Sequence, residues 1–242
     1  MIGNKRQDYL DYLLKSSKLE SYETLFRLAP HRYLQTSDIS RLLFYYEIFN
    51  LIKDLQGQIH LAGVSEGSTL FIMAHLAEII ESLNTSRQIV GFDIFDDYNE
   101  KYPLVCEQDG DYYDHTNQMP HCVAYSKLVE HVKCFNSSIR LDNFERIKLV
   151  KGNVVDTYPK FISSESPLIS ALFMHIETFS ADKAILESAW PNLGKGSIIV
   201  SSTLGNFNSP GVLRAVQEKV DIGKIRIMRS QFTSKMCYFV KD

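Results

Sequence analysis

The sequence predicts an α/β domain built on a doubly wound, mostly parallel β-sheet with an antiparallel C-terminal hairpin and N-terminal helices. From Gln58 onward, short apolar segments of strand length alternate with longer segments whose apolar residues have helical spacing. The short segments are nearly continuous apolar runs, which is typical of parallel strands that are buried on both faces. Segments 224–232 and 235–240 are separated by a short turn and predict a pair of antiparallel strands.

The individual elements follow from the same pattern. Strands are expected at 58–64, 88–95, 146–154, 168–178 and 196–200. Helices are expected at 68–83, 181–193 and 210–220. Residues 1–56 are expected to form a helical N-terminal extension, whose last helix runs from 37 to 55 after the cap cluster Thr36-Ser37-Asp38. Residues 57–242 are expected to form the α/β core of a single domain that spans residues 1–242.

Composition and charge exclude several function classes. The net charge of -3 gives no general attraction to nucleic acid or to an anionic membrane, and no apolar run approaches the roughly 20 residues that span a bilayer. The four cysteines have no C-x-x-C spacing, which indicates buried or free thiols in a reducing cytosol rather than a zinc site. We therefore expect a cytoplasmic protein that binds neither nucleic acid nor membrane.

A glycine-containing turn follows the first expected strand. Glycines at this turn let the backbone approach a ligand, and the helix that follows offers N–H donors. The candidate binding residues of the turn are Gly63, Val64, Gly67, Ser68 and Thr69. Two glycines also serve to make a strand–helix turn, so the turn alone does not decide whether a ligand binds there.

Two polar residues follow the next strands. Asp93 ends the second strand, about thirty residues after the glycine turn, where an acidic residue suits the hydroxyls of a ribose. The alternative is a helix cap or a solvated loop aspartate. Asn153 follows the third strand and is placed to meet an adenine edge, or else to serve only its own turn. The turn and Asp93 together favour a ligand that contains adenosine.

Residues 96–121 are polar, aromatic and without periodicity, which predicts a lid or binding loop.

These residues carry a family resemblance. The chain contains G-x-I-x-x-x-G-V-x-x-G-S from Gly57, G-F-D-x-F from Gly91, L-V-K-G-N-x-x-D-T-Y-P from Leu149, and Ser209-Pro210-Gly211 before the last helix. This order resembles the macrocin O-methyltransferase family, over roughly residues 32–220. The resemblance implies a Rossmann-like fold, S-adenosylmethionine (SAM) as methyl donor, a sugar hydroxyl as acceptor, and usually a magnesium ion held by aspartates.

The chain departs from the family at its acidic positions. Leu61 stands where the family usually has an acidic residue. The segment after the fourth strand is Met174-His175-Ile176-Glu177, where the family has a metal-binding aspartate. Ser201 and Ser202 follow the fifth strand, at a second carboxylate position. Because Mg²⁺ requires carboxylate oxygens in near-octahedral geometry, we expect no metal at this site.

The catalytic expectation is therefore metal-free base catalysis. His175, at the end of the fourth strand, is placed by topology to take the proton of the acceptor hydroxyl, and its neutral form is available near pH 7. A buried histidine with a hydrogen-bonded ring is the alternative. Glu177 is the second candidate for the base, or a residue that orients His175 or contacts the acceptor.

The sequence thus predicts a SAM-dependent O-methyltransferase that acts on a small sugar-like molecule. The alternative is a catalytically degenerate relative that binds SAM or a nucleotide sugar without turnover, which the loss of the acidic residues favours. A nicotinamide-dependent enzyme is disfavoured, because the chain lacks G-x-G-x-x-G after its first strand. The identity of the acceptor and the oligomeric state, including a homo-oligomer, stay open.

Overall fold

The structure is a computed structural model that divides the chain into two compact units, 1–43 and 44–242. It describes residue 29, residue 31 and residues 34–95, 125–202, 204–205, 210–234 and 236–242. Helix α3 (Thr36–Ile52) contains residues of both units, and at its start the Asp38 carboxylate accepts a hydrogen bond from the Gln35 N–H at 2.8 Å. Most of the expected N-terminal extension lies outside the described residues.

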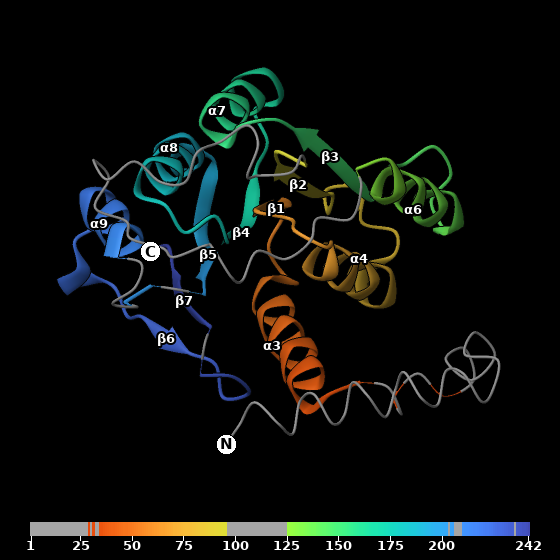
Figure 1. The fold of residues 1–242 in the computed structure, drawn as a ribbon, viewed down its shortest axis with the longest axis horizontal. Helices are drawn as coiled ribbons and strands as arrows, with labels where there is room; N and C mark the ends of the chain where they lie inside the picture. The colour runs from red at the N-terminus through yellow and green to blue at the C-terminus, as the bar shows by residue number, and fades with distance from the viewer. Residues whose placement is uncertain are drawn as a thin grey trace. The chain divides into compact units, whose positions relative to one another are not determined.

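The second unit is built on one seven-stranded sheet (Figure 1). The strands are β1 (Gln58–Ala62), β2 (Ile89–Asp93), β3 (Ile147–Lys151), β4 (Ile169–Met174), β5 (Leu193–Ser201), β6 (Met228–Arg229) and β7 (Cys237–Val240). Their order is β3-β2-β1-β4-β5-β7-β6, and β1 to β5 run parallel. Strand β7 runs antiparallel to both β5 and β6. This confirms the predicted doubly wound, mostly parallel sheet with an antiparallel C-terminal end.

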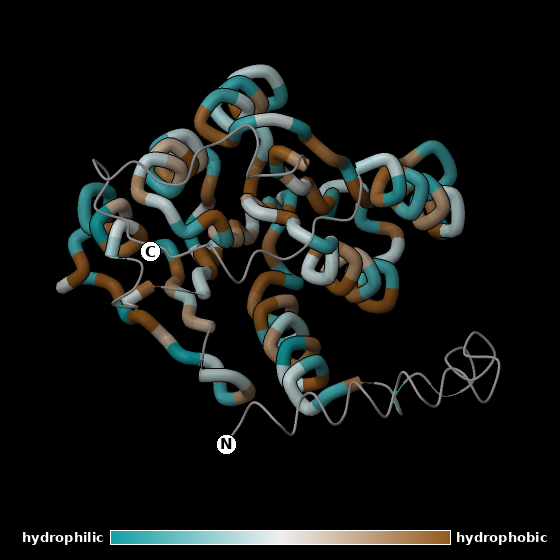
Figure 2. The backbone as a smooth tube through the Cα atoms, in the orientation of Figure 1, coloured by the Kyte–Doolittle hydropathy of each residue, from teal (hydrophilic) through white to brown (hydrophobic). Residues whose placement is uncertain are grey.

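Helices cover both faces of this sheet (Figure 1). They are α4 (Ser68–Glu81), α6 (Tyr125–Ser138), α7 (Val154–Glu165), α8 (Phe179–Ala189) and α9 (Pro210–Lys219). One core cluster joins the sheet to the 44–52 part of α3, α4 and α6, and the other joins it to α7, α8 and α9. Figure 2 shows brown and teal segments within these helices, as amphipathic helices require. Among the described residues, no helix is long and apolar enough to span a membrane.

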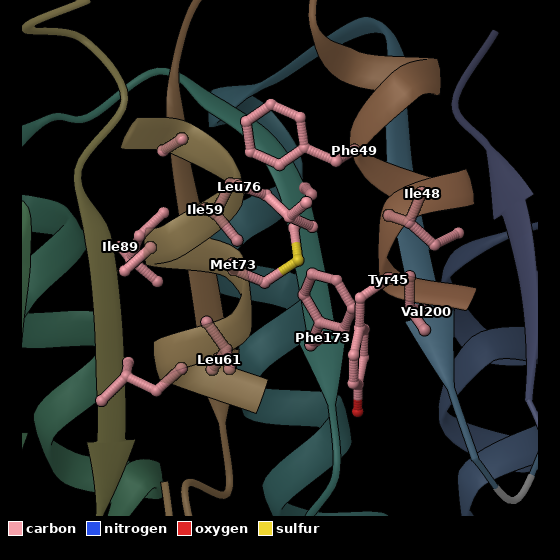
Figure 3. Packing of buried hydrophobic residues seen from close by; sticks show 14 of the residues in the cluster. Tyr45, Ile48, Phe49, Ile59, Leu61, Met73, Leu76, Ile89, Phe173 and Val200 are labelled. Carbon is pink, nitrogen blue, oxygen red and sulfur yellow. The ribbon is translucent and has the colours of Figure 1, made fainter. Parts of the chain in front are cut away.

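The first core cluster packs the 44–52 part of α3 against the sheet. Tyr45, Ile48 and Phe49 of α3 pack beside Met73 of α4 and Phe173 of β4 (Figure 3). The Tyr45 ring meets the Phe173 ring edge-on, with centroids 5.9 Å apart. The Tyr45 hydroxyl lies at the end of the cluster toward which the β2 arrow points, so α3 reaches the edge where the parallel strands end.

Two helices were not predicted, and one of them changes the surroundings of a candidate site residue. Helix α7 begins directly after Asn153, so the expected strand 146–154 is wrong beyond Lys151. Gly152, with φ of 135°, ends the strand in a backbone conformation that glycine adopts readily. Pro159 lies inside α7, and such a residue argues against a helix in the sequence. Helix α6 was also missed.

Other boundaries differ by a few residues. The expected strand 168–178 ends at Met174, and the expected strand 196–200 begins at Leu193. The expected helix 181–193 ends at Ala189 and continues as the 3₁₀ turn η4 (Trp190–Asn192). In the C-terminal hairpin, only Met228 and Arg229 of the expected strand 224–232 pair with β7, and η5 (Ile222–Lys224) precedes them.

Candidate active site

The segments after β1, β2 and β4 meet at one edge of the sheet. Strand β1 lies between β2 and β4, so the order of the strands reverses beside it. The Gly63 N–H donates to the Phe92 carbonyl at 2.9 Å, and the His175 N–H donates to the Ala62 carbonyl at 2.8 Å. Ligands of open α/β sheets bind at such a switch point, outside the carboxyl ends of the strands. This edge is the candidate site.

Gly63 has to be a glycine because the backbone of the segment after β4 passes very close to it. Its φ is 90°, in the left-handed region, and a Cβ built on it would lie 2.9 Å from the carbonyl carbon and oxygen of His175. Any larger residue would have to displace backbone atoms. The close packing of two strand ends therefore explains this glycine without a ligand.

Gly67 is the N-cap of α4, with φ of 83°. Having no side chain, it leaves the first-turn N–H groups of the helix without a side-chain cap, which is the arrangement that favours a bound anion or polar ligand. A Cβ at Gly67 would lie 3.0 Å from Leu128 Cδ1 of α6, so the glycine also makes room for that helix. Of the next two residues, Ser68 is exposed and Thr69 is half-buried.

Asp93 clamps the glycine turn with its carboxylate. Oδ2 accepts hydrogen bonds from the N–H groups of Val64 at 2.8 Å and Ser65 at 3.0 Å, and Oδ1 accepts one from Phe95 at 3.2 Å. A carboxylate has about four acceptor positions, so Oδ1 retains one for a hydroxyl donor. The side chain thus shapes the turn and could still bind a ribose hydroxyl.

Asn153 serves as the N-cap of α7. Its Oδ1 accepts a hydrogen bond from the Val155 N–H at 3.1 Å, and its carbonyl accepts one from Thr157 at 2.9 Å. The amide oxygen is therefore engaged by the helix, as the alternative interpretation of this residue expected. The Nδ2 amide is the group of this side chain that could reach an adenine edge, so its role as a ligand contact stays a prediction.

Tyr45 joins the site although the sequence interpretation did not include it. Its hydroxyl lies 2.6 Å from Thr69 Oγ1, in the first turn of α4. The signal was present, because Tyr45, Ile48, Phe49 and Ile52 have the spacing of a buried helical face. What the sequence could not show was that this face ends at the glycine turn, which depends on how α3 packs against the sheet.

His175 is half-buried directly after β4. Its ring meets the Phe173 ring edge-on, with centroids 5.8 Å apart, and its backbone lies against Gly63. The predicted position at the end of the fourth strand is therefore correct. Its predicted role as a base is a matter for experiment.

Glu177 connects the ends of β4 and β5. Its backbone is in the left-handed region, with φ of 69°, and its Oε1 accepts a hydrogen bond from Ser202 Oγ at 2.7 Å. The carboxyl group is largely buried, and this burial raises its pKa, while the hydrogen bond from Ser202 opposes the rise. The result is a carboxylate at the candidate site that is more basic than one in water.

The oxygen donors between β4 and β5 do not fit a magnesium ion. Ser201 is buried and its Oγ accepts a hydrogen bond from the Leu204 N–H at 3.1 Å, while the Ser202 hydroxyl donates to Glu177. One carboxylate and two engaged hydroxyls are a poor set of ligands for a hard cation. Within the described residues, no group of three or more His, Cys, Asp or Glu side chains could hold a metal ion.

The expected lid at 96–121 lies outside the described residues, so it stays a prediction. What can be described next to it is the edge of the site at β3 and α6. The Phe95 and Tyr125 rings lie against each other at an interplanar angle of 33°, with centroids 4.9 Å apart, and Lys151 Nζ lies 4.8 Å from the Tyr125 ring centroid. Phe95 and Tyr125, which flank residues 96–124 in the sequence, therefore lie side by side.

Strand order, helix layers and the site at the switch point define the class: the chain has a Rossmann-like methyltransferase fold. It is similar to the crystal structure of CalS11, calicheamicin methyltransferase, with a TM-score of 0.85 and 22% identity over 98% of this chain and 92% of that chain. An apo structure of CalS11, described as a TDP-rhamnose 3'-O-methyltransferase of calicheamicin biosynthesis, gives a TM-score of 0.78 and 21% identity over 98% and 94%.

The O-methyltransferase NovP is similar over 84% of this chain and 80% of its own, with a TM-score of 0.62 and 18% identity. No protein-family model matches the chain, and no curated protein matches it in sequence. Since these identities are low, the comparisons establish the fold, and the activity has to be argued from the site.

Proposed function

We propose that this protein is a SAM-dependent O-methyltransferase that methylates a hydroxyl of a sugar or glycosylated metabolite. Within the methyltransferase fold, the residue patterns around Gly63, Asp93 and Asn153 favour the macrocin O-methyltransferase family. One observation carries the proposal. The carboxylate of Asp93 holds the turn that leads into α4, and this turn leaves the first N–H groups of α4 without a side-chain cap.

The residues at this edge fit an adenosine-containing sulfonium donor. The remaining acceptor position of Asp93 would bind a ribose hydroxyl, and the turn from Gly63 to Thr69 would hold the polar amino-acid end against the N-terminus of α4. Bound SAM would supply a methyl group on a positively charged sulfur that is an activated leaving group. The protein has to align the acceptor with that methyl group and remove the acceptor's proton.

A group that can take the proton lies at the end of β4. His175 and Glu177 both lie there, and the His175 N–H donates to the Ala62 carbonyl at the end of β1. General base catalysis by such a group contributes typically about 10²–10⁴-fold in rate. Because the donors between β4 and β5 do not fit Mg²⁺, no step of this mechanism passes through a metal.

The acceptor class is proposed from the structural neighbours. CalS11 is described as acting on TDP-rhamnose, and its fold matches nearly the whole of this chain. We therefore propose a small sugar acceptor, including nucleotide-linked deoxysugars, and neither nucleic acid nor membrane as a partner. The net charge of -3 agrees with a small-molecule acceptor.

Calorimetric titration and a methyl-transfer assay test the proposal. SAM should bind, while NAD should not. A panel of TDP-linked deoxysugars and free glycosides, incubated with SAM, should give a methylated product and S-adenosylhomocysteine that mass spectrometry detects. Binding of NAD in place of SAM would contradict the donor assignment. Binding of SAM without methylation of any acceptor in the panel would contradict the enzymatic activity.

A second function has its own support. Leu61 is fully buried in the first core cluster, at the position where the family has an acidic residue, and Ser201 and Ser202 stand at a carboxylate position. These replacements favour a relative that binds SAM or a nucleotide sugar without turnover. The same two measurements separate the two functions, because this relative would bind SAM and yield no product.

A further inference from the structure

We propose that Glu177 is the base that takes the proton of the acceptor hydroxyl, and that Ser202 is the residue that positions its carboxylate. The proposal rests on the proposed methyltransferase function and goes beyond it, because it assigns the base to Glu177 rather than His175. It also gives a function to Ser202, which the sequence marked only as a missing carboxylate.

The backbone at Glu177 is the first observation. A residue with a Cβ is disfavoured at φ of 69°, and such conformations persist where the surrounding structure holds them, often at functional sites. Glu177 lies three residues beyond Met174, the last residue of β4. The left-handed conformation turns the chain here, and the side chain reaches the end of the neighbouring strand β5.

The hydrogen bond from Ser202 is the second observation. The Ser202 hydroxyl donates to Glu177 Oε1 at 2.7 Å, across two strands whose last paired residues are Met174 and Ser201. A serine hydroxyl has one proton, so this donor fixes the orientation of the carboxylate. It engages Oε1, and we assign Oε2 as the oxygen that takes the proton of the acceptor.

Burial of the Glu177 carboxyl group is the third observation. The Glu177 carboxyl is largely buried, so its pKa is raised, and a carboxylate with a raised pKa is a better proton acceptor. The titratable groups near this hydrogen bond include His175, on the same segment, Asp182, in the first turn of α8, and Cys237 of β7, whose thiol donates to the Ser201 carbonyl at 3.4 Å. Burial raises the pKa of Cys237 as well, so this thiol stays uncharged near neutral pH.

His175 has a different place in this arrangement. Its ring packs edge-on against Phe173 in the core, and its backbone lies against Gly63. These contacts hold the end of β4 against the glycine turn. We therefore assign to His175 a positioning function, while Glu177, hydrogen-bonded to Ser202, takes the proton.

The experiment compares Glu177→Gln, Ser202→Ala and the double variant, with SAM and a TDP-linked deoxysugar that gives product with the wild type. Glu177→Gln should lower kcat by roughly 10²–10⁴-fold and leave the Kd for SAM nearly unchanged. Ser202→Ala should lower kcat by roughly ten- to a hundredfold, the worth of a hydrogen bond to a charged group. The double variant should be no slower than Glu177→Gln, because Ser202 acts through Glu177.

The pH profile separates positioning from a structural function. The Ser202 hydrogen bond lowers the pKa of Glu177, so its loss should raise that pKa and move the rising limb of kcat to higher pH. Ser202→Thr keeps a hydroxyl and should restore both rate and profile. Ser197→Ala is the matched control, because it also removes a hydroxyl of β5, which donates to the Ile169 carbonyl at 2.7 Å. It should lower stability and leave kcat and the pH profile unchanged.

Each outcome decides the proposal. Nearly full activity in Glu177→Gln, a loss in the double variant that is the product of the single losses, or an unshifted profile in Ser202→Ala would overturn it while the methyltransferase function stands. A wild-type protein that binds SAM and methylates no acceptor would overturn the proposed function, and this assignment with it.

Discussion

The carboxylate of Asp93 accepts a hydrogen bond from the backbone N–H of Val64 at 2.8 Å, which joins the end of β2 to the turn after β1. The same oxygen also accepts the Ser65 N–H at 3.0 Å. The turn that opens the candidate site therefore depends on a negative charge from the neighbouring strand. A hydrogen bond to a charged group contributes about 1.5–3 kcal/mol, so this clamp is a significant part of the stability of the turn.

Asp93→Asn should weaken both folding and SAM binding. The substituted amide removes the charge and can point its own N–H groups at the donors of Val64 and Ser65, so we expect a loss of about 1–3 kcal/mol in the free energy of unfolding. The affinity for SAM should fall because the turn relaxes and the ribose loses its acceptor. Denaturant unfolding and calorimetric titration measure the two effects. Asp142→Asn, at an exposed turn, is the control and should change neither. Unaltered SAM affinity in Asp93→Asn would remove Asp93 from the site.

Gly63→Ala should destabilise the protein more than Gly205→Ala. Both glycines have a positive φ, 90° and 82°, so both substitutions incur about 1–2 kcal/mol of left-handed strain. At Gly63 the new methyl group would also meet the His175 backbone at 2.9 Å, whereas at Gly205 no described atom lies within 4 Å. Crowding in a packed region adds typically about 1–3 kcal/mol. Equal losses in thermal or denaturant unfolding would show that the strand ends can separate at little cost.

How far the sequence predicts this structure depends on the range of the interactions. Strand–helix alternation is local, and it predicted the parallel sheet, the glycine turn and the positions of Asp93 and His175 at strand ends. Helix α7 was missed because Pro159 is a local signal against a helix, while its burying face, with Tyr158, Phe161 and Ile162, packs on the sheet. Tertiary packing overrides local preference there.

The detailed chemistry of the site was beyond the sequence for the same reason. The Glu177–Ser202 hydrogen bond joins residues 25 positions apart, and the Tyr45–Thr69 contact joins residues 24 apart. Neither pair has a motif, because each arises from which strands and helices are neighbours. For Asn153, the position after the third strand was predicted correctly. Its side chain, however, caps helix α7, which was not predicted.

The pH dependence of stability should contain a contribution from His60. This residue is fully buried in β1, where Nδ1 lies 2.9 Å from the Tyr158 hydroxyl and Nε2 lies 2.8 Å from Gln58 Oε1. Burial lowers its pKa from 6.5 to about 3. The folded pKa is below the unfolded one, so the unfolded state binds the proton first as the pH falls. The stability that His60 contributes is present above pH 6.5 and is lost between 6.5 and about 3.

His60→Gln removes this titration and serves as the comparison. Between pH 7 and pH 4.5, the wild type should lose stability relative to His60→Gln with a slope that approaches about 1.4 kcal/mol per pH unit. The contributions of the other histidines and of the carboxylates cancel in the difference. Urea unfolding of both proteins at several pH values measures it. Parallel curves would show that His60 titrates normally in the folded state.

Arg146 should be among the most sensitive positions for folding. Its guanidinium is fully buried and donates to Glu78 at 2.8 Å and to the carbonyls of Asn84, Arg87 and Ser82 at 2.7, 2.8 and 2.9 Å. Arg146→Met would leave these acceptors unpaired, and removal of one partner of a buried ion pair costs about 3–5 kcal/mol.

A second ion pair, from Lys148 of β3, provides the control for Arg146. Lys148 lies 3.3 Å from Glu165, but the two side chains are 34% and 48% exposed. Lys148→Met should change the free energy of unfolding by less than about 1 kcal/mol, because exposed ion pairs contribute little. Chemical denaturation of both variants gives the comparison. A small loss in Arg146→Met would mean that water replaces the guanidinium at its carbonyl partners.

Methyl transfer should survive the removal of divalent cations. The reason lies in the donors between β4 and β5, since Ser202 donates its proton to Glu177 and the Ser201 Oγ accepts the Leu204 N–H. Both hydroxyls are thus engaged within the protein, and Mg²⁺ takes carboxylate oxygens in near-octahedral geometry in preference to such groups. Dialysis against EDTA should leave kcat unchanged, and added Mg²⁺ should not stimulate it.

The EDTA experiment also tests the hydrogen bond between Ser202 and Glu177, at the ends of β5 and β4. Ser202→Asp would place a second carboxylate beside Glu177, and two carboxylates at this position should create a weak site for Mg²⁺. We expect this variant to be slow in EDTA, because the like charges repel, and to recover part of its rate when Mg²⁺ is added. Initial rates with and without EDTA compare it directly with the wild type. Wild-type activity that disappears in EDTA and returns with Mg²⁺ would show that the protein uses a metal, and Glu177 and Asp182 would then be the first ligands to examine.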